Sequence, residues 1–280
     1  MTTDKTTKTT KTKKTASGKP DIVTAGLIII GDEILSGRTQ DTNLAYLATW
    51  LNELGVRLME ARVIADDQKA IVEAVNRCRT RFDYVFTTGG IGPTHDDITT
   101  DAIARTFGVA APVHDEALRR LRQHYGQAGL NPARRRMARI PEGASLIDNP
   151  ISRAPGYRIE NVFVLAGIPA VMQAMLESLR HELVGGAPVH SHALAVHLLE
   201  SVLAGGLADI QDRNPDVAIG SYPFFRDGRV GANLVLRSTD TARIDAVADE
   251  VRAMIRGLGA EPIETPPGLE RLGGPRSPCP

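Results

Sequence analysis

The sequence predicts an α/β fold with two domains: a three-layer α/β/α domain with a doubly wound, mostly parallel sheet, and a smaller α+β domain after it. Three observations carry this prediction. The apolar run at 22–30 is typical of a strand covered on both faces. Three strand-then-helix units follow one another up to residue 108, which favours a parallel sheet. The pattern then changes after the Gly-Gly-Ala-Pro stretch at 185–188.

The first domain is expected over residues 21–184. Its apolar strand leads into a helix with a leucine stripe, for which Asp41 is the candidate N-cap and Gly55 the residue beyond the end. Strands and helices then alternate in "VRLMEARVIA", "DDQKAIVEAVNRCR", "FDYVFTT" and "DITTDAIARTFG". Two further helices are expected at 113–126 and 132–139. Short strands in "ASLIDNP", "GYRIEN" and "VFVLAG" and a helix after Pro169 complete the domain.

The second domain is expected over residues 189–262, where the apolar pattern indicates the order β-α-β-β-α. Residues 1–20 are rich in threonine and lysine and have almost nothing to bury, so this segment is expected to be disordered. The segment 263–280 is rich in proline and glycine and is expected to be a flexible tail.

Charge and cysteine content restrict the partners and the compartment. The chain has 33 basic and 33 acidic residues, but its first twenty residues hold six lysines and one acid, so the remainder is net negative. Such a body is a poor general nucleic-acid binder. The longest apolar run is far below the roughly 18 residues that span a bilayer, so no membrane association is expected. Two cysteines build no disulfide framework, which favours a reducing cytoplasm.

The stretch "TTGGIGPTHDD" at 87–97 raises a conflict between its glycines and its acids. Bare backbone invites phosphate, but the loop lacks the lysine and the adjacent hydroxyl of a Walker-type ATPase. Asp96 and Asp97 would repel a phosphate oxygen at 4 Å by about 4 kcal/mol per charge pair at an effective dielectric near 20. Either a cation lies between them and the phosphate, or the phosphate binds elsewhere in the loop.

A divalent metal resolves this conflict. Asp96 and Asp97, with Glu33 or Asp66 from neighbouring strand ends, would supply oxygen ligands to a metal that bridges pyrophosphate oxygens and lowers the pKa of an attacking water. The backbone N–H groups of 89–92 would hold the phosphate on the other side. The alternative is that Asp96 or Asp97 simply caps the following helix.

Six motifs point to a family. They are "GDEILSGRTQDTN", "TTGGIGPTHDDIT", "IPEGASLIDNP", "APGY", "LAGIP" and "IGSYP". In this order and spacing, from about residue 21 to 261, the chain resembles the N-terminal part of CinA-like (competence/damage-inducible protein A) proteins, which contains a MoaB/Mog-like molybdopterin-binding domain. Full-length members also carry a C-terminal nicotinamide-nucleotide deamidase domain, for which this sequence leaves no room, so that activity is not expected.

The resemblance implies a homodimer with a pocket for a small nucleotide or pterin ligand. It implies metal-dependent hydrolysis of ADP-ribose to AMP and ribose 5-phosphate, with Mg²⁺, Co²⁺ or Mn²⁺ as the divalent metal and K⁺ as a further ion. The alternative is a protein that binds molybdopterin or a nucleotide without hydrolysis, related to molybdenum cofactor biosynthesis. A third reading is a structural or interaction protein in which the loop acids are caps only.

The candidate catalytic and metal-binding residues are Asp97, Asp96 and Glu33. The candidate ligand-binding residues lie at predicted strand ends, in the arginine cluster or in the motifs of the resemblance. They are Gly31, Asp32, Asn43, Asp66, Thr88, Gly89, Gly90, Gly92, Pro93, Thr94, Arg135, Gly156, Tyr157, Ser221 and Tyr222.

Several of these assignments have simpler alternatives. Helix capping is the default role of Asp66, and Asn43 either donates to a ligand or caps. Arg135 is the choice for a phosphate or ribose contact, although most of its cluster is expected to be the wet face of a helix. A turn at 155–156 would bring Tyr157 to the pocket, and the residues at 221–222 would contribute only if the two domains touch.

Overall fold

The computed structural model describes residues 22–226 and 228–264. The chain forms two compact units that divide between Pro188 and Val189, and each unit is described by itself. The predicted disordered segment 1–20 and the greater part of the predicted tail 263–280 lie outside the described residues. Residues 263 and 264 correct the tail prediction, because they form a short strand of the second unit. In the part of the chain described, no helix is long and apolar enough to cross a bilayer.

The first unit is built on a six-stranded sheet in the order β2-β1-β3-β6-β5-β4. The first four strands in this order run parallel, whereas β5 and β4 pair antiparallel. The strands are β1 (Val23–Ile30), β2 (Val56–Ile64), β3 (Tyr84–Thr88), β4 (Ser145–Ile147), β5 (Gly156–Ile159) and β6 (Val162–Leu165). Every residue of β1 except Thr24 is buried, which confirms the prediction of a strand covered on both faces.

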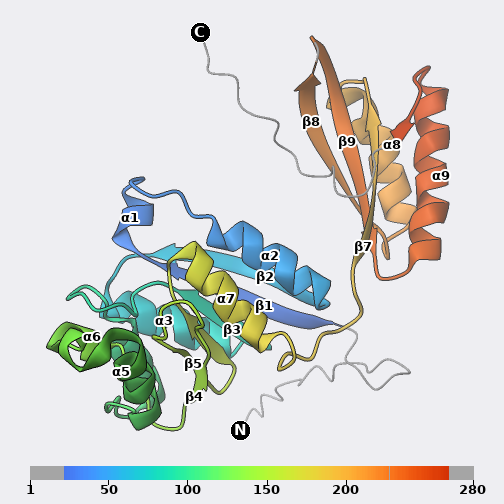
Figure 1. The fold of residues 1–280 in the computed structure, drawn as a ribbon. Coiled ribbons are helices and arrows are strands. Elements are labelled where there is room, and N and C mark those ends of the chain that lie inside the picture. The colour runs from blue at the N-terminus through green and yellow to red at the C-terminus, as the bar shows by residue number, and fades with distance from the viewer. Residues whose placement is uncertain (1–21, 227, 265–280) are drawn as a thin grey trace, which may run out of the picture. The chain divides into compact units, whose positions relative to one another are not determined.

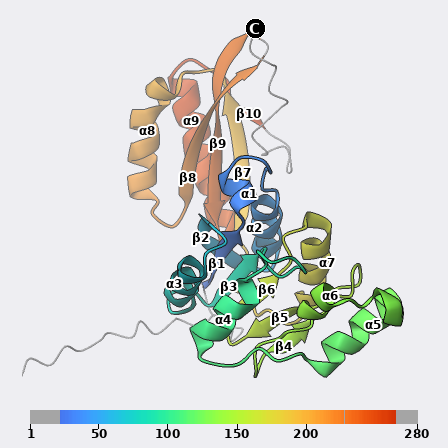
Figure 2. The ribbon, with the colours of Figure 1, turned by 90° about the vertical axis from the view of Figure 1, so that its left-hand side faces the viewer.

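Helices cover both faces of this sheet (Figures 1 and 2). One face packs against α2 (Asn43–Glu53) and α7 (Pro169–Leu179). The other face packs against α3 (Gln68–Arg79), α4 (Thr99–Phe107) and α5 (Asp115–Gly129). The short helices α1 (Asp32–Leu35) and α6 (Pro132–Arg136) follow β1 and α5 in the chain. The three-layer, doubly wound, mostly parallel architecture predicted from the sequence is confirmed.

Local signals explain where the helices begin and end. The N-cap of α2 is Thr42, which corrects the choice of Asp41, although Asp41 accepts a hydrogen bond from the Leu44 N–H at 2.9 Å. Gly55 follows the end of α2 with a φ of 72°. Left-handed backbone of this kind favours glycine at a helix end. The prediction for α5 is corrected: the helix continues past residue 126 to Gly129, with a kink at Gly126, whose φ is 68°.

The second unit is a four-stranded antiparallel sheet in the order β10-β7-β9-β8, packed on α8 and α9 (Figure 1). Its elements are β7 (His190–Val196), α8 (Glu200–Arg213), β8 (Ala218–Arg226), β9 (Arg229–Ser238), α9 (Thr241–Gly257) and β10 (Ile263–Glu264). The predicted β-α-β-β-α order is therefore confirmed, with β10 added next to β7.

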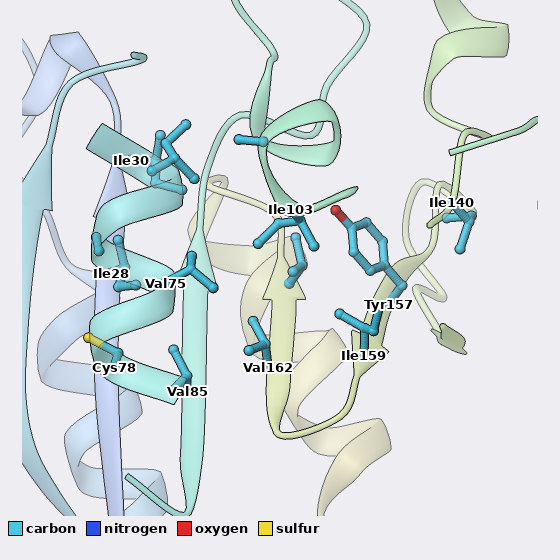
Figure 3. Packing of buried hydrophobic residues seen from close by; sticks show 14 of the residues in the cluster. Ile28, Ile30, Val75, Cys78, Val85, Ile103, Ile140, Tyr157, Ile159 and Val162 are labelled. Carbon is cyan, nitrogen blue, oxygen red and sulfur yellow. The ribbon is translucent and has the colours of Figure 1, made fainter. Parts of the chain in front are cut away.

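Tyr157 and Gly156 require a correction, because they lie in a strand and not in a turn that faces a ligand. β5 pairs with β4 on one side and β6 on the other, so its side chains alternate between two covered faces. The Tyr157 ring is only 1% exposed and lies among Ile103, Ile140 and Ile159 (Figure 3). Its hydroxyl donates to Thr100 Oγ1 at 3.2 Å, and burial raises the pKa of this phenol.

The substitution Tyr157→Phe is therefore expected to act on stability alone. It removes one buried hydrogen bond and keeps the ring, so the free energy of unfolding should fall by about 1 kcal/mol. Chemical denaturation measures this loss, and titration with AMP measures ligand affinity, which should not change. A weaker affinity at unchanged stability would return Tyr157 to the pocket.

Candidate functional site

The candidate site lies at the point where the chain, having added β2 on one side of β1, continues with β3 on the other side. β1 lies between β2 and β3, and the connections from β1 to β2 and from β2 to β3 run through α2 and α3 on opposite faces. At such a switch point the carboxyl ends of neighbouring strands leave a crevice that suits a ligand. Gly31 follows β1, Gly89 follows β3, and Gly167 comes shortly after β6.

These strand ends approach closely because glycine supplies no Cβ. Gly89 has a φ of 102°, and a Cβ there would collide with the carbonyl oxygen of Ile30 at the end of β1. Gly90 has a φ of 68°, and the Thr99 side chain occupies the space that its Cβ would need. Thr99 in turn donates from Oγ1 to the Gly89 carbonyl at 3.0 Å, which ties the loop to the first turn of α4.

The side chain of Asp97 folds back onto the loop that follows β3, residues 89–94, here called the glycine loop. Its Oδ1 accepts the Gly92 N–H at 2.7 Å, and its Oδ2 accepts the Thr94 N–H at 2.7 Å and the Thr94 hydroxyl. A carboxylate offers about four lone-pair directions, so these three bonds leave one on Oδ1. Asp97 therefore shapes the loop first, and it keeps a single free acceptor position for a ligand or a metal.

Neither acid of the pair caps the helix that follows. The N-cap of α4 is Ile98, and no side chain accepts a hydrogen bond there. Asp96 is exposed, and the nearby Thr94 side chain is the main reason that its pKa is lowered. The alternative that Asp96 or Asp97 is a helix cap is thus wrong, although Asp97 does have a local structural role.

Two further acids near the switch point, Asp66 and Asp67, have different roles in the structure. Asp67 caps α3 by accepting the Ala70 N–H at 2.8 Å. Asp66 instead accepts the Asp32 N–H at 3.0 Å, which links the end of β2 to the start of α1. Burial raises the pKa of Asp66, and the nearby carboxylates of Asp32, Glu33 and Asp96 raise it further.

This raised pKa gives a testable pH dependence. The folded state holds the Asp66 proton to a higher pH than the unfolded state, so the free energy of unfolding falls as pH rises from about 3.8 through the folded pKa. The variant Asp66→Asn keeps an oxygen acceptor for Asp32 and removes the charge. Its Tm should exceed that of the wild type at pH 7, and the difference should vanish below pH 3.8. Equal Tm values at pH 7 would show that the ionised form of Asp66 does not lower the stability of the folded state.

The glycine loop forms one wall of a cavity of about 540 Å³, here called the glycine-loop pocket. This volume is in the range of small-molecule sites, about 300–1,000 Å³. The opposite walls come from the end of α5, from α6, from the 149–154 loop and from the start of α7. The lining residues are Glu33, Gly89, Gly90, Ile91, Gly92, Pro93, Asp97, Tyr125, Arg134, Met137, Asn149, Ser152, Ala154, Ala166, Gly167, Ile168, Val171 and Met175.

Only part of the backbone of the loop is available to a ligand. The Gly89 N–H donates to Leu165 at 3.2 Å and the Gly92 N–H to Asp97. In the described residues the N–H groups of Gly90 and Ile91 donate to no protein acceptor. Within residues 89–92, these two donors are therefore the ones left unpaired.

The other predicted site residues lie at various distances from this pocket. Pro93 lines it, and Thr94 lies in the same loop. Gly31 and Thr88 are buried at strand ends, and Asn43 donates to the Gly167 carbonyl at 2.8 Å with its Oδ1 buried and unpartnered. Arg135 is exposed and does not line the pocket, which corrects the choice within the arginine cluster.

Ser221 and Tyr222 lie in β8 of the second unit. Ser221 borders a hollow beside α8, and the Tyr222 hydroxyl accepts from Arg237 at 3.2 Å. Their contribution to the pocket of the first unit stays a prediction.

The acids at the pocket do not form a ready-made metal centre. In residues 22–226 and 228–264, no group of three or more His, Cys, Asp or Glu side chains is arranged to hold a metal ion. Two carboxylates, Glu33 and Asp97, do line the glycine-loop pocket. Mg²⁺ is commonly bound through one or two carboxylates together with substrate phosphates, so this pair fits such an ion when a phosphorylated ligand is bound.

Twelve of the residues that line the pocket were not among the candidates from the sequence, and Arg134 and Tyr125 are two of them. Asn131 caps α6 by accepting the Arg134 N–H at 2.9 Å, and Pro132 occupies the first turn. That Asn-Pro signal could have located the helix start, but not the direction in which a single turn of helix presents its arginines.

Comparison with known proteins identifies the families that this chain resembles. Residues 26–185 match a family model described as "Probable molybdopterin binding domain", and residues 188–261 match one described as "FAD synthase, middle domain". A protein of Aeropyrum pernix is 33% identical over 261 residues, which cover 89% of this chain and 95% of that protein. A CinA-like protein of Salinibacter ruber is 33% identical over 242 residues, which cover 81% of this chain and 59% of the relative.

A solved structure supports the same relationship. The crystal structure of CinA from Thermoplasma acidophilum, described as of unknown function, matches 58% of this chain and 98% of its own, with 34% identity and a TM-score of 0.55. The first of the two matched family models alone covers more than half of the chain. The chain therefore belongs to the CinA-like family of proteins that carry a molybdopterin-binding domain.

Proposed function

We propose that the first unit is a metal-dependent nucleotide pyrophosphatase that hydrolyses ADP-ribose to AMP and ribose 5-phosphate. The observation that carries this proposal is the pairing of free N–H donors with two carboxylates in one pocket. Gly90 and Ile91 offer the donors, and Glu33 and Asp97 offer the acids. A pyrophosphate needs both positive hydrogen-bond donors and a counter-ion when it binds beside carboxylates.

The reaction requires little covalent chemistry from the protein. A water oxygen bonds to one phosphorus atom and gives up a proton to solvent, the bridging P–O bond breaks with its electron pair going to the departing phosphate, and AMP and ribose 5-phosphate leave. A bound divalent ion would neutralise phosphate charge and lower the pKa of the water. The Gly90 and Ile91 N–H groups would orient the phosphates, and Glu33 and Asp97 would hold the ion. Asp96 is left out of this set, because it is exposed and does not line the pocket.

The test is an assay of the purified protein with ADP-ribose and Mg²⁺, Mn²⁺ or Co²⁺, with EDTA as the blank and with K⁺ present or omitted. AMP should be released, and Glu33→Gln should lower the rate by about 100-fold or more, since a ligand to the metal would be lost. Glu73→Gln, at an exposed position of α3, is the matched control and should leave the rate unchanged. No release above the blank with any of the metals would refute the proposal.

One observation favours a second candidate, a protein that binds molybdopterin or a nucleotide without hydrolysis. Three of the acceptor positions of Asp97 are already used within the loop, and much of the pocket wall is apolar. Calorimetric titration that shows pterin binding, together with no turnover of ADP-ribose, would favour this candidate. The homodimer implied by the resemblance belongs to either proposal, and sedimentation of the full chain checks it.

A further inference from the structure

The wall of the glycine-loop pocket that faces α5 and α6 contains a flat cation that the proposed hydrolysis does not use. The guanidinium carbon of Arg134 lies 4.2 Å from the centroid of the Tyr125 ring. Its Nη1 donates to the Gly129 carbonyl at 2.6 Å. An aromatic ring under the group and a hydrogen bond at its edge together fix the plane of the guanidinium, so both side chains are pre-positioned.

Arg134 has no carboxylate partner. Among the ion pairs of the described residues none includes Arg134, and the same holds for Arg135 and Arg136, whereas Arg139 pairs with Asp101. The surroundings of Arg134 in the pocket include apolar side chains, among them Met137, Ile91 and Met175. A guanidinium is planar and more weakly hydrated than an ammonium, so a planar π-system can stack on its face.

We propose that Arg134, held flat on Tyr125, is the platform on which the planar heterocycle of the ligand stacks. Tyr125 lies against one face of the guanidinium, and the proposal assigns the opposite face to the ring of the ligand. The phosphate end of the ligand would then lie at the N–H groups of Gly90 and Ile91. The ligand class is a purine or pterin that carries phosphate. This inference rests on the pocket of the proposed function but not on the hydrolysis itself.

The direct alternative is that Arg134 binds phosphate through its fork of N–H donors. Its Nη1 already donates to Gly129, so a two-point grip on phosphate would use the edge formed by Nε and Nη2. The unpaired backbone N–H groups of Gly90 and Ile91 are a separate site for that charge. Binding of a phosphate ligand without a ring distinguishes the two arrangements.

The experiment compares ligands with and without a ring on a matched set of variants. Binding of adenosine, AMP and ribose 5-phosphate is measured by calorimetry, and binding of free pterin by its fluorescence. Arg134→Lys keeps the positive charge but loses the planar guanidinium, and Arg134→Ala loses both. Tyr125→Phe keeps the aromatic ring against which Arg134 packs. Arg135→Ala is the control, because Arg135 is the next residue on α6 and is exposed. Thermal melts check that each variant is folded.

We expect the two Arg134 variants to bind adenosine, AMP or pterin about tenfold more weakly, the size of a lost stacking contact. Ribose 5-phosphate affinity should be unchanged, and Tyr125→Phe and Arg135→Ala should match the wild type. An equal loss for ribose 5-phosphate would overturn the proposal in favour of a phosphate contact. Equal behaviour of Arg134→Ala and Arg135→Ala would also overturn it.

The same data separate this inference from the pyrophosphatase. If no AMP is released from ADP-ribose but the ring-bearing ligands lose affinity in the Arg134 variants, the hydrolysis fails and the platform stands. If the folded wild type binds neither adenosine nor pterin at millimolar concentration, the platform is refuted whatever the hydrolysis result. The relative affinity for adenosine and pterin shows which heterocycle the platform prefers.

Discussion

Gly89→Ala is expected to destabilise the first unit by roughly 2–5 kcal/mol, the sum of a steric overlap and an unfavourable backbone conformation. The added Cβ would collide with the Ile30 carbonyl of β1, and main-chain atoms of a strand paired on both sides cannot move aside as a side chain would. The φ of 102° adds strain for any L side chain. Chemical denaturation should show the loss, and the surviving folded protein should bind AMP poorly, because the loop and β1 have separated.

Gly37→Ala provides the matched control for this prediction. Gly37 also has a positive φ, 71°, but a Cβ there would meet no atom within 4 Å. The Gly37→Ala substitution should therefore lower the free energy of unfolding only by the cost of the unfavourable backbone conformation, about 1–2 kcal/mol. If the two variants lose the same stability, the close approach of β3 and β1 does not depend on the missing Cβ.

Asp97→Asn is expected to open the glycine loop and to weaken AMP binding by tenfold or more. The amide keeps one acceptor oxygen, but its NH₂ group would face an N–H donor of Gly92 or Thr94. Hydrogen bonds to a charged group contribute about 1.5–3 kcal/mol, so stability should fall by an amount in that range. A loss of 1.4 kcal/mol is a factor of ten in affinity. Denaturation and calorimetry in EDTA measure both effects without metal.

The EDTA condition separates the two roles of Asp97. If stability and metal-free AMP binding are normal and only metal-dependent turnover is lost, Asp97 is a metal ligand and the loop does not need its charge. Asp96→Asn serves as the stability control, because Asp96 is exposed and its Tm effect should be small.

The architecture of the first unit could be predicted because its signals are local and repeated. A fully apolar strand, helices with one apolar stripe and glycines at helix ends each act within about fifteen residues, and their order implies the parallel sheet. Tyr157 shows the limit of such signals. A Pro-Gly pair reads as a turn, but pairing of β5 with strands on both sides decides that its side chains are buried.

The sequence indicates where the candidate site lies but not its detailed geometry. The topology alone directs a ligand to the ends of β1 and β3, which is where the loop lies. The folding back of Asp97 onto Gly92 could not be read from the sequence, because adjacent acids before a helix look the same whether they cap, bind metal or close a loop. The choice between Arg134 and Arg135 depended on the orientation of a five-residue helix, which no apolar stripe defines.

The position of β1 between β2 and β3 has a consequence for synthesis of the chain. Both neighbours come later in the sequence, and β3 ends only at residue 88. At roughly 5–20 residues per second the ribosome needs several seconds to add these two strands. During this delay the apolar segment 23–30 has incomplete pairing and is a natural binding site for chaperones. Aggregation of truncated nascent chains should therefore decline once β3 has left the exit tunnel.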